Sequence, residues 1–118
     1  MSESFPDLLA GLNRQIADLR ANAPKTMQAF SGLARAALEP GTLDTRTKEL
    51  LAIAIAIATR CDGCIGFHVK AALAAGATRE EIVETIGLAI YMGAGPSMIY
   101  GAETLRALQE LAPAPASA

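Results

Sequence analysis

The feature that most constrains the fold is an uninterrupted apolar run from Leu50 to Ala58. Within it, Ile53, Ile55 and Ile57 alternate with alanines, which is the period of a strand. The same nine residues could also form a short stretch of helix that is apolar on every side. The run is about half as long as a bilayer-spanning helix, so it predicts a buried element of a soluble domain.

The strand interpretation leads to a thioredoxin-like arrangement, in which a strand precedes a helix that begins with Cys61-x-x-Cys64. Such a sheet needs several more strands, and neither the residues before Lys48 nor those after Cys64 alternate in this way. Valine occurs only twice, whereas alanine is abundant and is a good helix former and a poor strand former. The run therefore predicts a helix at the centre of the core.

The rest of the chain also predicts helices, with apolar residues at helical spacing between recognisable start and stop signals. Together they give an all-α fold of about six helices: from Ser4 as N-cap to Leu19, from Pro24 to Leu38, from Asp44 as N-cap to Ala58, from Cys61 to Ala75, from Thr78 as N-cap through Ile90, and a sixth through Met98 to Leu108. Thr78 and Glu81 form a capping-box pattern. The Gly93–Pro96 segment interrupts or ends the fifth helix.

Apolar periodicity also predicts which residues are buried. The second helix should bury Met27, Phe30, Leu33, Ala34, Ala37 and Leu38, and the fifth should bury Ile82, Val83, Ile86, Ala89 and Ile90. Beside the Gly93–Pro96 segment, the two methionines and two tyrosines are expected in the core, although they could instead line an apolar pocket. These residues are Tyr91, Met92, Met98 and Tyr100.

Length and composition point to one domain that associates with copies of itself. The 118 residues fit a single domain, with a core over about 5–111 and a flexible tail over 112–118. Hydrophobic residues make up 52% and charged residues 19%, which is more apolar surface than one small core absorbs, so a homo-oligomer is expected. A net charge of −2 without a basic tract argues against nucleic acid, and the absence of a signal-peptide pattern favours a cytoplasmic protein that does not bind membranes.

One group of residues has the spacing and the side chains of a reactive site. Cys61, Cys64 and His68 stand at i, i+3 and i+7, so on a helix all three project from one face. His68 is the only histidine, and it lies one turn beyond Cys64, close enough to accept the thiol proton. A free thiol is mostly protonated at neutral pH, and an adjacent base or a helix N-terminus raises the reactive thiolate fraction.

Glu49 can join this site only through a helical hairpin. In one continuous helix it would lie about 18 Å from Cys61. If the third and fourth helices pack antiparallel with a turn near Thr59 and Arg60, Glu49 and His68 lie at comparable distances from the turn and can face each other. A carboxylate on the far imidazole nitrogen would fix the tautomer and make His68 a better base.

Other interpretations of these residues are weaker. The cysteines alone could be small buried hydrophobes, and Glu49 alone could be an exposed helix residue. A zinc site lacks a fourth Cys or His ligand, and covalent haem attachment needs a histidine where the chain has Ile65. Gly93-x-Gly95 lacks the lysine of phosphate-binding loops. Neither a metal nor another cofactor is expected.

These residues resemble the AhpD-like alkylhydroperoxidases of the carboxymuconolactone decarboxylase superfamily. Glu49, then Cys61-Asp62-Gly63-Cys64, then His68 look like that family's signature, and the segments 76–82 and 92–96 look typical of its small members. The resemblance covers about residues 5–111. It implies an all-helical fold, assembly into dimers, trimers or hexamers, and peroxide reduction through a disulfide between the two cysteines.

The resemblance also implies roles by position. Cys64 would attack the peroxide, activated by His68 and Glu49, and Cys61 would be the more exposed thiol that resolves the intermediate and meets a dithiol or lipoyl-type reductant. The best-studied members have a histidine between the cysteines, where this chain has Gly63. Members that decarboxylate the lactone generally lack the cysteine pair.

Physical arguments divide on which cysteine attacks. The helix N-terminus and Arg60 favour a thiolate at Cys61, whereas contact with His68 favours Cys64, which we choose. The leading hypothesis is a thiol peroxidase or disulfide reductase that acts on organic hydroperoxides. The alternatives are a non-catalytic helical assembly or redox sensor, and a lactone decarboxylase or isomerase that uses Glu49 and His68 as acid and base.

Overall fold

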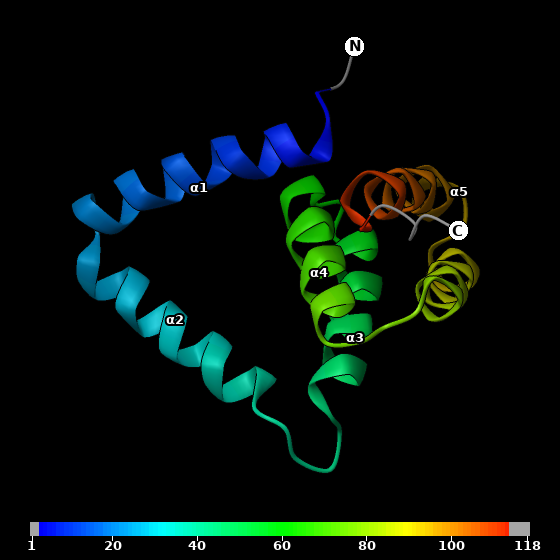
Figure 1. Ribbon diagram of the computed structural model, residues 1–118, viewed down its shortest axis with the longest axis horizontal. Helices are drawn as coiled ribbons and strands as arrows, with labels where there is room; N and C mark the ends of the chain where they lie inside the picture. The colour runs from blue at the N-terminus through cyan, green and yellow to red at the C-terminus, as the bar shows by residue number, and fades with distance from the viewer. Residues whose placement is uncertain (1–2, 114–118) are drawn as a thin grey trace.

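The computed structural model describes residues 3–113, which contain five helices (Figure 1). They are α1 (Phe5–Asn22), α2 (Pro24–Leu38), α3 (Thr45–Ala58), α4 (Asp62–Ala74) and α5 (Arg79–Leu111). No strand occurs among these residues, so the all-α prediction is confirmed and the strand interpretation of the central run is wrong. The predicted flexible tail falls almost entirely outside the described range.

Three helices begin at the caps that the sequence predicts. The Ser4 hydroxyl accepts from the backbone N–H of Asp7 at 3.2 Å, and the Asp44 carboxylate accepts from that of Thr47 at 2.7 Å. At the start of α5, Thr78 and Glu81 form the full capping box. Each cap satisfies backbone donors that a helix start leaves free, which fixes where these helices begin.

The core lies where α3, α4 and α5 pack together. α3 and α4 form an antiparallel hairpin, so the predicted central hairpin is present (Figure 1). The largest fully buried apolar side chains include Ile53 and Ile57 of α3, together with Ile65, Val69 and Ile82. The third helix is central to the core, as the apolar run predicts, although Leu51 and Ile55 remain 48% and 62% exposed on the face that α4 and α5 leave uncovered.

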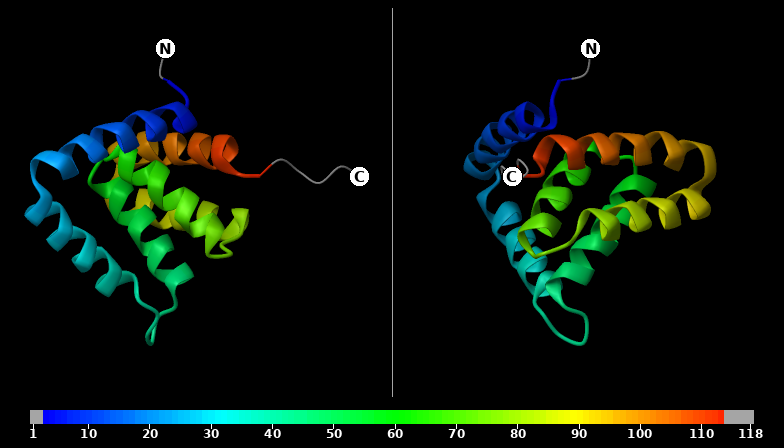
Figure 2. Two further views of the ribbon diagram at one scale, coloured as in Figure 1. Left: turned by 60° about the vertical axis from the view of Figure 1, so that its left-hand side comes forward. Right: turned by 45° about the vertical axis from the view of Figure 1, so that its right-hand side comes forward.

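α5 bends back on itself at Ala94, whose φ of 56° and ψ of −140° are not helical. Its two parts, which correspond to the predicted fifth and sixth helices, lie side by side (Figure 2). By length and apolar composition α5 could cross a membrane, and 22% of its most apolar window is buried in the protein. The bend at Ala94 divides it into two parts that are each shorter than the roughly 20 residues that a span requires.

The tip of this bend is exposed, so the expectation that its tyrosines and methionines belong to the core is wrong for three of the four, whereas Tyr100 is half-buried and packs against the core as expected. Tyr91 is 80% exposed, Met92 77% and Met98 54%, because no other element within residues 3–113 covers the turn. Val83 was also expected to be buried and is 38% exposed.

α1 and α2 extend from the core as an open arm (Figures 1 and 2). The start of α1 is held by Glu110, whose carboxylate accepts from the Phe5 backbone N–H at 2.7 Å, and by Arg106, whose guanidinium lies 4.5 Å from the centre of the Phe5 ring. α2 buries no residue at all. Its predicted apolar face is only partly covered in the single chain: Met27, Ala34 and Leu38 are half-buried. Phe30 and Leu33 are 61% and 64% exposed.

Candidate active site

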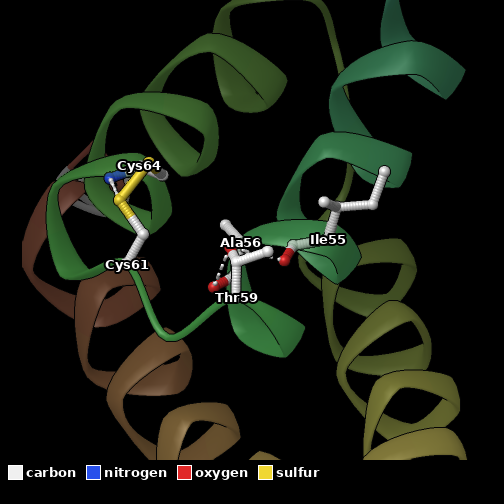
Figure 3. Close-up of a disulfide and its surroundings, with 5 residues drawn as sticks. All are labelled: Ile55, Ala56, Thr59, Cys61 and Cys64. Carbon is white, nitrogen blue, oxygen red and sulfur yellow. Dashed lines mark hydrogen bonds between the residues drawn. A yellow bond between two sulfur atoms is a disulfide. The ribbon is translucent and has the colours of Figure 1, made fainter.

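The turn between α3 and α4 positions the cysteine pair (Figure 3). The Thr59 hydroxyl donates to the Ile55 carbonyl at 2.9 Å, and Arg60 adopts a left-handed φ of 58°. The N–H of Cys61 then donates to the Ala56 carbonyl at 3.1 Å, which closes the end of α3. Cys61 thereby becomes the N-cap of α4, one residue before the helix begins.

Cys61 and Cys64 form a disulfide across the first turn of α4, with their Cα atoms 5.2 Å apart. The Cys61 sulfur also accepts from the Cys64 backbone N–H at 3.2 Å. Of the two residues, Cys64 is exposed and Cys61 is intermediate. The resemblance implied the opposite order of exposure, and the reason is local: Cys61 lies in the tight turn against α3, whereas Cys64 lies on the open face of α4.

Glu49 and His68 meet across the hairpin, as the antiparallel geometry predicts. The Nδ1 atom of His68 lies 3.2 and 3.3 Å from the two carboxylate oxygens of Glu49. Glu49 is only 2% exposed, and the His68 side chain is 33% exposed. With a carboxylate as its partner, Nδ1 carries the hydrogen and donates it, which leaves Nε2 as the acceptor on the other side of the ring.

Cys64 and His68 share a cavity of about 230 Å³ between α3 and α4. Its lining consists of Ala52, Ile55, Ala56, Thr59, Cys64 and His68. Cys61 does not line this cavity. The arrangement can therefore bring a small molecule to one thiol and one imidazole at once, with a buried carboxylate behind the imidazole.

Sequence reasoning did not single out the α3 residues that line this cavity. The lining residues of α3 are separated by four and then three positions, so they share one face of the helix: Ala52, Ala56 and Thr59. Alanines on that face leave space in front of α4 that larger side chains would fill. One signal in the sequence could have found them: Glu49 lies three residues before Ala52, so helical spacing places both alanines on the same face as this candidate site residue.

The position between the cysteines is covered by α1. A Cβ atom at Gly63 would lie 2.7 Å from Cδ1 of Leu12, and one at Gly66 would lie 2.8 Å from Cδ2 of Leu9. Both glycines allow α1 to pack closely on α4. A larger side chain at the position of Gly63 would need Leu12 to move.

The site and the fold agree with comparison against known proteins. The family model of the carboxymuconolactone decarboxylase family matches residues 24–107, which include Glu49, both cysteines and His68. The chain belongs to the carboxymuconolactone decarboxylase family. The match starts at the first residue of α2, so α1 lies outside it.

Solved members of this family share the fold. The crystal structure of an apo carboxymuconolactone decarboxylase family protein from Legionella pneumophila matches with a TM-score of 0.90 and 47% identity, over 92% of this chain and 97% of that chain. A family protein from Thermotoga maritima, for which involvement in the antioxidative response has been suggested, matches with a TM-score of 0.72 and 28% identity, over 87% of this chain and 91% of that one.

Sequence relatives include proteins that carry no functional name. An uncharacterised protein of Cupriavidus necator is 38% identical over 105 residues, which are 89% of this chain and 93% of the relative. An uncharacterised protein from the cox locus of Paracoccus denitrificans is 42% identical over 83 residues, which are 70% of this chain and 75% of the relative. The family is thus shown by sequence and by structure.

Proposed function

We propose that the protein is a thiol-dependent peroxidase that reduces organic hydroperoxides through the Cys61–Cys64 pair. The observation that carries the proposal is the cavity shared by Cys64 and His68, with Glu49 buried on the far nitrogen of the imidazole. A thiol needs a base to become a nucleophile at neutral pH, and this is the one thiol of the pair whose cavity contains the histidine.

The reaction begins with the reduced enzyme. His68 Nε2 accepts the Cys64 thiol proton, and the thiolate attacks the terminal oxygen of the hydroperoxide. The O–O bond breaks, the sulfur is oxidised to sulfenic acid, and the alkoxide takes the proton from His68 and leaves as an alcohol. The Cys61 thiol then gives up its proton as its sulfur attacks the Cys64 sulfur, and the sulfenic oxygen leaves with that proton as water while the disulfide forms.

An external dithiol or lipoyl-type protein completes the cycle by two thiol–disulfide exchanges, in which it is oxidised to its own disulfide. We place its first attack on Cys64, because this is the more exposed of the two cysteines in the single chain. Cys61 then leaves as a thiolate at the N-cap of α4, where free backbone N–H groups stabilise negative charge. A stabilised leaving thiolate makes this direction of exchange faster.

The proposal includes a cytoplasmic homo-oligomer that binds neither nucleic acid nor membranes. Its support is the uncovered apolar surface of the arm, where Phe30 and Leu33 of α2 are 61% and 64% exposed. Apolar surface of this kind on a small chain is covered when copies associate. Multi-angle light scattering should give a trimer or hexamer mass, and a mass of 12.2 kDa at all concentrations would contradict the assembly.

Peroxide consumption with a dithiol reductant tests the activity. The wild type should consume cumene hydroperoxide with multiple turnovers, and Cys64→Ser should abolish this. Cys61→Ser, reduced and then freed of the dithiol, should consume about one peroxide per site and then stop, because neither a second cysteine nor an added thiol is present to resolve the sulfenic acid. Equal activity in the wild type and in Cys64→Ser would contradict the proposal.

A further inference from the structure

A second cavity lies beside the one that contains Cys64 and His68. It has a volume of about 220 Å³ and lies between α3 and the first part of α5. Its lining consists of Ala54, Ile55, Ala58, Leu88, Ala89, Met92 and Gly93. Ile55 lines both cavities, so they are neighbours on the two sides of a single side chain.

The alternation of isoleucine and alanine along α3 produces this pair of cavities. Ile53 and Ile57 point into the core and are fully buried, whereas Ile55 stands between the two cavities and is 62% exposed. Ala52 and Ala56 line the cavity of Cys64, and Ala54 and Ala58 line the second one. A larger side chain at either pair of alanines would fill the adjoining space.

The second cavity is suited to hydrocarbon and to nothing charged. Every residue that lines it is apolar or glycine. The α5 side of the cavity belongs to an 18-residue stretch, from Thr85 to Ala102, that contains no charged residue. Apolar ligand sites in proteins are lined in this way, whereas a polar ligand would find no partner for a hydrogen bond.

We propose that this second cavity, the tail cavity, binds the apolar part of the hydroperoxide while its O–O group lies at Cys64. The inference rests on the proposed peroxidase function and adds a substrate class: hydroperoxides with a flexible alkyl chain that crosses Ile55. Since one water takes up about 30 Å³ in the liquid, 220 Å³ has room for a short alkyl chain and not for a sterol-sized group. Ile55 sets where the chain must bend.

A series of linear alkyl hydroperoxides tests the inference, with hydrogen peroxide as the substrate that has no tail. In the wild type, kcat/KM should rise about two- to fourfold for each added methylene from ethyl to hexyl, since each methylene leaves water for an apolar surface that is partly open. Beyond the length of the tail cavity the rise should stop.

Two variants locate this effect. In Ala58→Leu the new side chain fills the tail cavity, so the ratio of kcat/KM for hexyl hydroperoxide to that for hydrogen peroxide should fall about tenfold or more. Met92→Lys should lower the same ratio by placing a charge at the cavity, and Met92 is 77% exposed, so the fold tolerates the change. The matched control is Ala17→Leu, an exposed alanine of α1 that lines neither cavity, which should leave the ratio unchanged.

The results distinguish failure of the tail-cavity proposal from failure of the proposed function. If the wild type consumes hydrogen peroxide but shows no dependence on chain length, the tail cavity is refuted and the peroxidase function stands. If Ala58→Leu lowers activity on all peroxides equally and also changes the mass in light scattering, the surface is an interface between copies, which overturns the inference. If the wild type reduces no peroxide, the proposed function fails and the tail cavity fails with it.

Discussion

Replacing Glu49 by glutamine should show how much of the rate depends on the tautomer and orientation of His68, as distinct from the presence of its imidazole. The Glu49 carboxylate contacts Nδ1 at 3.2 and 3.3 Å and is 2% exposed, so it can only accept the Nδ1 hydrogen. A glutamine amide can instead donate to Nδ1, which moves the ring hydrogen to Nε2 and removes the acceptor that faces the cavity. An oriented general base typically contributes about 10²- to 10⁴-fold.

We therefore expect Glu49→Gln to slow the reaction of Cys64 with peroxide by about a hundredfold. Stability should change by no more than about 1 kcal/mol, because a neutral isostere avoids the cost of a buried charge and His68, whose side chain is 33% exposed, can bond to water. Stopped-flow measurement on the reduced enzyme gives the rate, and urea unfolding gives the stability.

Glu84→Gln is the matched control, since it makes the same change at an exposed position on α5. It should leave the rate of peroxide reaction unchanged. A rate for Glu49→Gln within twofold of wild type, alongside a large loss in His68→Ala, would refute the argument that Glu49 sets the tautomer.

Two further predictions concern stability. The Phe5 backbone N–H, with help from Arg106, holds the pKa of Glu110 below its usual range, so this carboxylate stabilises the fold at neutral pH and the stabilisation is lost as pH falls below about 4. Glu110→Gln should therefore lower stability at pH 7 and flatten its decline towards acid, and an unchanged acid limb in thermal unfolding would contradict this. Ala94 has φ 56° and ψ −140°, a region that is essentially restricted to glycine, so Ala94→Gly should stabilise the protein by about 1 kcal/mol in urea unfolding. A loss of stability there would show that the backbone of the bend is not strained.

The sequence predicts the contact between Glu49 and His68 because helix geometry leaves few choices. Once the turn is placed at Thr59 and Arg60, residues at similar distances on the two helices must face each other. The caps at Asp44 and Thr78 are equally local, since a side chain bonds to a backbone N–H three residues away. Local geometry of this kind can be read from residue types and spacing.

Exposure could not be predicted in the same way. Periodicity tells which residues share a face, but not whether the single chain covers that face. Phe30 of α2 and Ile55 of α3 both lie on apolar faces that remain largely exposed in the described part of the chain. The exposure of Cys64 depends on the same question, because it is set by which elements surround the start of α4.

The backbone conformation at the bend of α5 could not be predicted from the sequence either. The bend of α5 contains Gly93, Ala94 and Gly95. Of these three residues it is Ala94 that takes the conformation that a glycine would adopt most easily. Gly93 is required for another reason, since a Cβ there would collide with the Ser97 side chain, whereas Gly95 has open space. The pattern of glycines predicts a bend and not which residue carries the strain.

Trapping of the sulfenic acid tests the central claim most directly, that Cys64 is the thiol that attacks peroxide. Each single-cysteine variant, Cys61→Ser and Cys64→Ser, is reduced, treated with one equivalent of hydroperoxide in the presence of dimedone, and analysed by mass spectrometry. The account predicts one dimedone adduct on Cys64 in Cys61→Ser and none on Cys61 in Cys64→Ser. An adduct on Cys61 in Cys64→Ser, with none on Cys64 in the converse variant, would show that the helix N-terminus governs reactivity in place of His68.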